Sequence, residues 1–157
     1  MKKTIYTVID CSGSMSEGGK LLIARGAARA VEQYFRLGYG LAEIKLIAWS
    51  NDARIVAWDT DQEYPHELLV SQGSSSSHAL ITLLGVKSVS NVLIITDGFW
   101  SQADSKALKR WKDSLPLDTI RVIKVGADSS PQLKGTDVFS AEDLFAALDG
   151  WLEGGVA

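Results

Sequence analysis

Short apolar runs that alternate with polar, turn-forming segments predict a chain of alternating strands and helices. Residues 4–9 are mostly apolar and β-branched, and residues 91–96 contain four consecutive aliphatic side chains. Both patterns are typical of strands that are covered on both faces. Residues 119–125 predict a further strand, and Val138 with Phe139 predicts a short last one.

The apolar runs at residues 44–49 and 53–58 predict a hairpin. Only Ser50, Asn51 and Asp52 separate the two runs. A connection this short joins antiparallel neighbours, because parallel strands need a longer crossover. One antiparallel strand is therefore expected at an edge of the sheet.

Apolar side chains at helical spacing predict a long helix over residues 20–37, with Gly38 at its C-terminal cap. Ser77, Ser101 and Ser140 each stand where a serine can cap a following helix. The shorter helices are predicted over residues 65–70, 78–84, 101–114 and 141–152.

This order of elements predicts an α/β fold. We expect a Rossmann-like, doubly wound and mostly parallel sheet, with one antiparallel edge strand and helices on both faces. The 157 residues are enough for one domain with its own core, and we place it at residues 1–153. Residues 154–157 are expected to form a disordered tail.

Composition and charge exclude several classes of protein. The net charge is −3 and no stretch is strongly basic, which argues against nucleic acid as a partner. The single cysteine, Cys11, cannot form an internal disulfide. The apolar run before Asp10 is too short for a signal peptide, and no run approaches the roughly 18 apolar residues of a membrane span. We therefore expect a cytoplasmic protein with no membrane partner.

Oxygen-bearing side chains gather where the predicted strands end. Asp10 follows the first strand, and Asp97 follows the strand at residues 91–96. The carboxyl ends of parallel strands meet at one edge of a doubly wound sheet, which is where ligands bind. Ser12 and Ser14 follow Asp10 directly. Carboxylate and hydroxyl oxygens suit a hard cation, so the sequence predicts a site for Mg²⁺ or Mn²⁺.

These motifs resemble those of von Willebrand factor type A (vWA) domains, in particular the bacterial stand-alone type. The sequence Asp10-Cys11-Ser12-Gly13-Ser14 matches the first motif of their metal-ion-dependent adhesion site, and Thr96-Asp97-Gly98 matches another. The resemblance implies that Ser12, Ser14 and Ser74 contact the ion directly, whereas Asp10 and Asp97 act mostly through water. It also implies that an Asp or Glu of a partner protein fills the remaining position.

The resemblance departs from the family pattern at the third motif, where four serines replace the usual Gly-Gly-Thr loop. Spacing from the following helix favours Ser74 as the ligand, with Ser75 as the alternative. The residues expected at the rim that contacts a partner are Ser16, Glu17, Ser75, Phe99 and Trp100.

We therefore expect a metal-dependent protein-binding module rather than an enzyme. Related domains of this size act as adaptors for an AAA+ ATPase or for a kinase and phosphatase system, which is an expectation from the resemblance alone. The alternative is a metal-dependent hydrolase of the phosphatase type. Such an enzyme needs a second aspartate two residues after Asp10, and Ser12 stands there. His66 and His78 are isolated and are expected at the surface.

Overall fold

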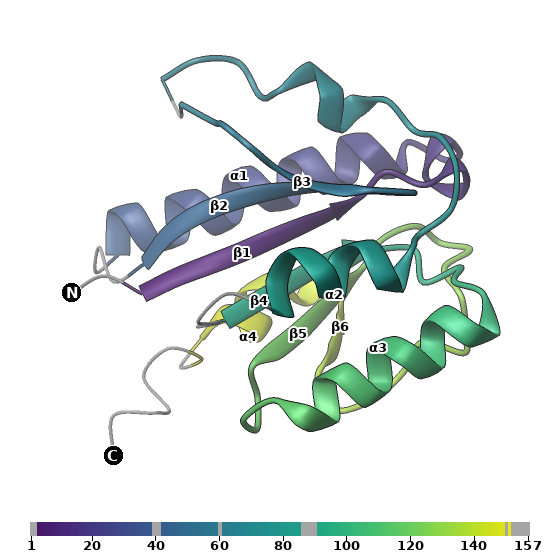
Figure 1. Ribbon diagram of the computed structural model, residues 1–157. Helices are drawn as coiled ribbons and strands as arrows, with labels where there is room; N and C mark the ends of the chain where they lie inside the picture. The colour runs from purple at the N-terminus through teal and green to yellow at the C-terminus, as the bar shows by residue number, and fades with distance from the viewer. Residues whose placement is uncertain (1–2, 39–41, 60, 86–90, 150, 152–157) are drawn as a thin grey trace.

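A six-stranded sheet runs through the centre of the molecule in the computed structural model (Figure 1). The structure describes residues 3–38, 42–59, 61–85, 91–149 and 151, and the predicted tail at residues 154–157 lies outside them. The sheet has the strand order β3-β2-β1-β4-β5-β6. The strands are β1 (Lys3–Asp10), β2 (Ala42–Trp49), β3 (Ala53–Val56), β4 (Asn91–Thr96), β5 (Ile120–Lys124) and β6 (Val138–Ser140).

The pairing of the strands confirms the predicted fold class. β1, β2, β4, β5 and β6 are parallel, whereas β3 pairs with β2 in the antiparallel direction. The hairpin register joins Trp49 to Ala53 and Leu46 to Val56. β3 ends at Val56 rather than at Trp58, because no further residue of β2 pairs with it.

Helices cover both faces of the sheet, with α1 and α4 on one face and α2 and α3 on the other (Figure 1). None of the described helices is long and apolar enough to cross a membrane. The α-helices are α1 (Lys20–Gly38), α2 (Ser77–Gly85), α3 (Gln102–Ser114) and α4 (Leu144–Leu148). The 3-10 helices are η1 (Gly13–Ser16), η2 (His66–Leu69) and η3 (Ala141–Asp143).

The predicted helix ends are confirmed in part. The Ser101 hydroxyl accepts a hydrogen bond from the Asp104 amide at 3.0 Å and caps α3. The cap assigned to Ser77 was wrong, because the hydroxyl that accepts from the α2 backbone belongs to Ser76. Ser77 instead donates its hydroxyl to Asp104 at 2.7 Å and so joins α2 to α3.

The last predicted helix, at residues 141–152, was too long. It divides into η3 and α4, and α4 ends at Leu148. The backbone leaves the helix because Asp149 adopts an extended conformation, with ψ near 124°. The following Trp151 is buried, and its indole nitrogen donates to the Asp118 carbonyl at 2.8 Å.

Alternation along the strands builds two core layers. Ile5 and Ile9 of β1 lie in the layer beneath α1 and α4. Tyr6 and Val8 lie in the opposite layer with the apolar side chains of α2 and α3. Because side chains of a strand point to alternate faces, one strand serves both layers.

β1 and β4 lie at the centre of the sheet, between the two core layers, and position the candidate site. β1 and β4 are parallel neighbours, with Ile9 beside Ile95. From this pair the chain winds outward in both directions, to β2 and β3 on one side and to β5 and β6 on the other. Ligands of doubly wound sheets bind at such a switch point, outside the carboxyl ends of the strands. Asp10 is the last residue of β1, and Asp97 directly follows β4.

Candidate metal centre

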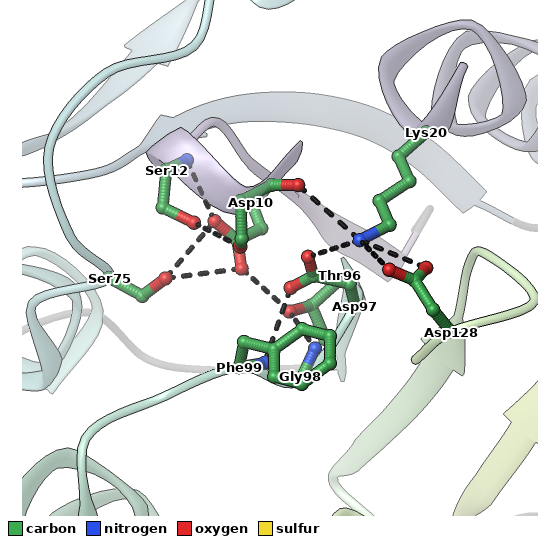
Figure 2. Close-up of polar contacts among 10 residues, drawn as sticks. Asp10, Ser12, Lys20, Ser75, Thr96, Asp97, Gly98, Phe99 and Asp128 are labelled. Carbon is green, nitrogen blue, oxygen red and sulfur yellow. Dashed lines mark hydrogen bonds and ion pairs between the residues drawn. The ribbon is translucent and has the colours of Figure 1, made fainter. Parts of the chain in front are cut away.

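The Asp10 carboxylate is fully buried and accepts hydrogen bonds from three separate segments (Figure 2). The Ser12 amide donates to Oδ1 at 2.9 Å, and the Thr96 hydroxyl donates to Oδ2 at 2.6 Å. The Ser75 hydroxyl lies 3.1 Å from both carboxylate oxygens. With its oxygens shared among these donors, Asp10 is suited to hold groups that contact an ion rather than to contact the ion itself.

The charge of Asp10 is nevertheless only partly compensated. Burial raises the pKa of its carboxyl above the usual range, and the nearby Asp97 adds to that rise. Hydrogen bonds from Thr96 and Ser12 act in the opposite direction. The ionised form is therefore disfavoured in this protein surrounding, and a cation bound nearby would favour it.

Thr96 connects Asp10, at the end of β1, with the turn after Asp97. Its hydroxyl donates to Asp10 and accepts a hydrogen bond from the Gly98 amide at 2.9 Å. Gly98 has a φ of 78°, and a Cβ at this position would lie 2.8 Å from the Leu133 side chain. Glycine therefore allows the chain to turn tightly behind Asp97.

Residues 73–77 form the serine loop, and the residues that follow Asp10 form the first loop. Backbone hydrogen bonds hold the serine loop against the first loop. Gly13 donates to the Gly73 carbonyl at 2.9 Å, and Gln72 donates to the Cys11 carbonyl at 2.9 Å. The Trp49 indole nitrogen donates to the Ser76 carbonyl at 2.8 Å, on the far side of the loop. These bonds fix the loop before and after its central serines.

Within that loop the structure brings Ser75, not Ser74, to Asp10. Ser74 is exposed, and its amide and hydroxyl both donate to Asn51 Oδ1, at 3.0 and 3.1 Å. Gly73 has a φ of 70° and leaves no room for a side chain beside Asn51. The structure therefore places Ser75, the alternative that the sequence left open, next to Asp10, and the serine that would contact an ion stays a prediction.

The hydroxyl groups fit a small divalent cation. Ser12 Oγ and Ser14 Oγ lie 3.4 Å apart. Adjacent ligands of an octahedral Mg²⁺ ion lie about 3 Å apart, given metal–oxygen distances of roughly 2.1 Å. In the described part of the chain, no three His, Cys, Asp or Glu side chains form a group that could hold a metal ion. An ion here would therefore depend on serine hydroxyls together with Asp10 and Asp97.

Lys20 is a site residue that the sequence analysis missed. Its side chain is 1% exposed, and its ammonium group lies 3.0 Å from Asp97 Oδ2 and 3.2 Å from Asp128 Oδ1 (Figure 2). Burial lowers the pKa of Lys20, but hydrogen bonds with Asp97 and Asp128 outweigh it and leave the pKa raised. The available signal was its helical spacing, because Lys20 stands four residues before Ala24 on the buried face of α1.

The predicted rim residues divide into exposed and packed ones, and Ser75 is buried beside Asp10 instead of lying on an exposed rim. Ser16, Glu17 and Phe99 are exposed, and the Phe99 side chain is 47% accessible. Trp100 instead packs edge-on against the buried Trp49, with ring centroids 5.8 Å apart. Trp100 therefore contributes to the core beneath the rim, whereas Phe99 is an exposed aromatic side chain at the rim.

The remaining candidate groups are the two histidines and the cysteine. His66 on η2 and His78 on α2 are both exposed, as expected. The Cys11 thiol is buried, and burial raises its pKa to about 12. A thiol held protonated in this way is a packing residue and not a nucleophile.

Comparisons with solved structures define the class of fold. The chain has a TM-score of 0.64 to the manganese-loaded TRAP protein of Plasmodium vivax, with 13% sequence identity over 96% of this chain and 73% of that one. A von Willebrand factor type A protein from Catenulispora acidiphila has a TM-score of 0.58 and 19% identity over 98% of this chain. Proximal thread matrix protein 1 from the mussel byssus, with a zinc-occupied metal site, has a TM-score of 0.55 and 13% identity over 94% of this chain.

The chain therefore has the vWA fold, as its motifs implied. It spans 42% of the Catenulispora chain and 45% of the mussel chain, less than half of either. No family model and no curated protein matches its sequence.

The double role of Thr96 leads to a test with an internal control. Thr96→Val removes a donor to Asp10 and an acceptor for Gly98 while keeping the shape of the side chain. The free energy of unfolding should fall by about 3 kcal/mol, because a buried carboxylate and a buried amide lose partners.

Thr7→Val is the matched control. Thr7 is also fully buried, in β1, but its hydroxyl has no hydrogen-bond partner among the described residues. This change should leave the stability within about 1 kcal/mol or increase it. Urea unfolding of both variants checks the prediction, and equal losses would contradict it.

Proposed function

We propose that the chain is a metal-ion-dependent protein-binding module. The observation that supports this most directly is the arrangement around Asp10. A buried carboxylate at the sheet switch point organises Ser12 and Ser75, and Ser14 lies 3.4 Å from Ser12. Ser12, Ser14 and Ser75 would hold the ion, while Asp10 and Asp97 would act through hydrogen bonds and water.

The donor set explains why such a site would attract an acidic partner. The hydroxyl ligands are neutral, and the oxygens of Asp10 are occupied by protein donors. A bound ion would therefore supply an electrophilic position that a partner Asp or Glu can fill. Mg²⁺ or Mn²⁺ is the proposed ion, and the manganese-loaded TRAP structure supports Mn²⁺ as a probe.

The proposed partner surface surrounds that open position. The loops after β1 and β4 and the serine loop are together called the metal loops. Ser16, Glu17 and Phe99 are exposed in these loops. One charge-assisted contact sets the register of a complex, but packed neighbouring residues are needed for useful affinity. By resemblance, the partner belongs to an AAA+ ATPase system or to a kinase and phosphatase system.

The proposal includes the absence of catalysis. Ser12 stands where a phosphatase of the competing type needs an acid/base aspartate, and both histidines are exposed. Among the described residues, no histidine base is hydrogen-bonded to a serine hydroxyl in the manner of a serine hydrolase. The Mn²⁺-loaded protein should not hydrolyse phosphoesters or acyl esters. Turnover that disappears in Asp10→Asn would show instead that the site is catalytic.

Metal binding is tested by thermal stability. Mn²⁺ or Mg²⁺ at about 100 times its dissociation constant should raise the melting temperature of the wild-type protein by roughly 5–10 °C, because it binds only the folded state. Ser75→Ala should remove this increase, since Ser75 contacts Asp10 and is a proposed ligand of the ion.

Ser74→Ala is the control, because the Ser74 hydroxyl contacts Asn51 instead. It should retain the full increase in melting temperature. The opposite result for the two serines would return the ligand role to Ser74. No increase in the wild-type protein at millimolar ion, checked by calorimetry, would refute the metal site.

Partner binding is tested by affinity capture from the host extract in Mn²⁺ and in EDTA. Proteins that are retained in Mn²⁺ and released by EDTA are the candidates, and their affinity can then be measured. Phe99→Ala should weaken binding about tenfold or more, because an exposed aromatic anchor is lost at the rim. Its Mn²⁺ affinity should not change.

Leu117→Ala is the control for a general loss of exposed apolar surface. Leu117 is 99% exposed and precedes β5. It therefore lies at the amino-terminal ends of the parallel strands, whereas the metal loops lie at their carboxyl ends. Its removal should leave partner affinity unchanged. Undiminished partner binding in EDTA would show that the interface lies elsewhere on the domain.

A further inference from the structure

The Lys20 ammonium joins the loops that follow β1, β4 and β5. Besides Asp97 and Asp128, it lies 3.4 Å from the Ser14 carbonyl in the first loop. It also lies 5.2 Å from the centre of the Phe99 ring, at the exposed rim. Lys20 thus contacts three predicted site residues: the Asp97 carboxylate, the Ser14 backbone and the Phe99 ring.

The fold makes room for this lysine. Gly126, in the loop after β5, has a φ of 95°, and a Cβ there would lie 2.7 Å from Lys20 Cε. The loop therefore passes close to the lysine stem at a residue without a side chain. The same loop then presents Asp128, which is 62% exposed, to the ammonium group. Lys20 is enclosed by the site rather than placed on its surface.

A charge count shows what the lysine does to a metal site. Asp10 and Asp97 are both fully buried. Beside a bound cation both carboxylates are ionised and carry two negative charges. Lys20 cancels one of them by pairing directly with Asp97. The charge of Asp128 is largely screened by solvent because the side chain is exposed. A divalent cation therefore meets a buried charge near −1 instead of −2, and the loaded site retains a net positive charge.

We propose that Lys20 is a built-in counter-cation that lowers the metal affinity of the site and, in exchange, raises its affinity for a carboxylate ligand. This inference rests on the proposed function. The lysine and the ion repel each other and compete for Asp97, so metal binding is weakened. The same positive charge attracts an anion that approaches the loaded site. Lys20 also keeps Asp97 paired when no metal is bound, so the metal-free domain stays folded.

The proposal predicts effects of opposite sign in one variant, Lys20→Met. The dissociation constant for Mn²⁺, measured by calorimetry, should fall on the order of tenfold. Acetate serves as the carboxylate probe, and its binding is followed by the Mn²⁺-enhanced relaxation of its methyl protons. Acetate should bind the Mn²⁺-loaded variant roughly threefold more weakly than the loaded wild type, because the local positive charge is reduced.

The metal-free variant should also be less stable. Its melting temperature should fall by roughly 10 °C, because Asp97 becomes an unpaired buried charge. Mn²⁺ should restore more stability to the variant than to the wild type. If Lys20→Met does not fold without metal, Lys20→Gln carries the same comparisons, since its amide can donate to Asp97 without adding charge.

Lys112→Met is the matched control. Lys112 on α3 forms an ion pair of 2.8 Å with Asp137, a residue outside the metal loops. This variant should keep the wild-type affinities for Mn²⁺ and for acetate. A similar gain in Mn²⁺ affinity in Lys112→Met would assign the effect to net charge and would overturn the proposal.

The remaining outcomes separate this inference from the proposed function. If the wild type binds Mn²⁺ and Lys20→Met binds it equally or more weakly, Lys20 is a structural residue only and the inference falls alone. If only Lys20→Met binds Mn²⁺, the inference holds, and the wild-type domain is not a metal-dependent module. If neither protein binds Mn²⁺, both the inference and the proposed function are overturned.

Discussion

The buried carboxylate of Asp10 is the group around which the candidate site is arranged. A fully buried charge is tolerated only where donors surround it, and here the donors come from the first loop, the serine loop and the end of β4. The position of Ser75 follows from this constraint, as does the turn at Gly98, because Thr96 serves Asp10 and Gly98 together. The site is therefore held in place by the protein before any ligand arrives.

The two aspartates at the sheet edge are stabilised by different means. Asp10 is surrounded by hydroxyl and amide donors, whereas Asp97 is paired with the Lys20 ammonium and accepts from the Phe99 amide. Neutral donors leave the charge of Asp10 available to a cation. The ammonium group neutralises Asp97 locally. The side of the site at Asp10 is therefore negative, whereas the charge of Asp97 is neutralised by Lys20. The rim residue Phe99 lies next to Lys20, on the neutralised side.

Most of the fold could be predicted because its signals are local. Residues 92–95 are four consecutive aliphatic residues, which predicted a buried strand, and the short link after Trp49 predicted a hairpin. The choice between Ser74 and Ser75 was not local. It depends on the left-handed turn at Gly73 and on Asn51, which lies 23 positions earlier in the chain. Lys20 was missed for a similar reason, since its partners lie 77 and 108 positions away.

The buried Cys11 has a practical consequence for experiments on this domain. It is the single cysteine of the sequence, and its thiol stays protonated at neutral pH because burial raises its pKa to about 12. A second cysteine placed on the surface, for example in η2 or at the start of α3, would therefore be the one that reacts with a maleimide probe. Spin labels or fluorophores can be attached at chosen positions without first removing the native cysteine. Distances between the rim and the rest of the domain then become measurable in an otherwise natural chain.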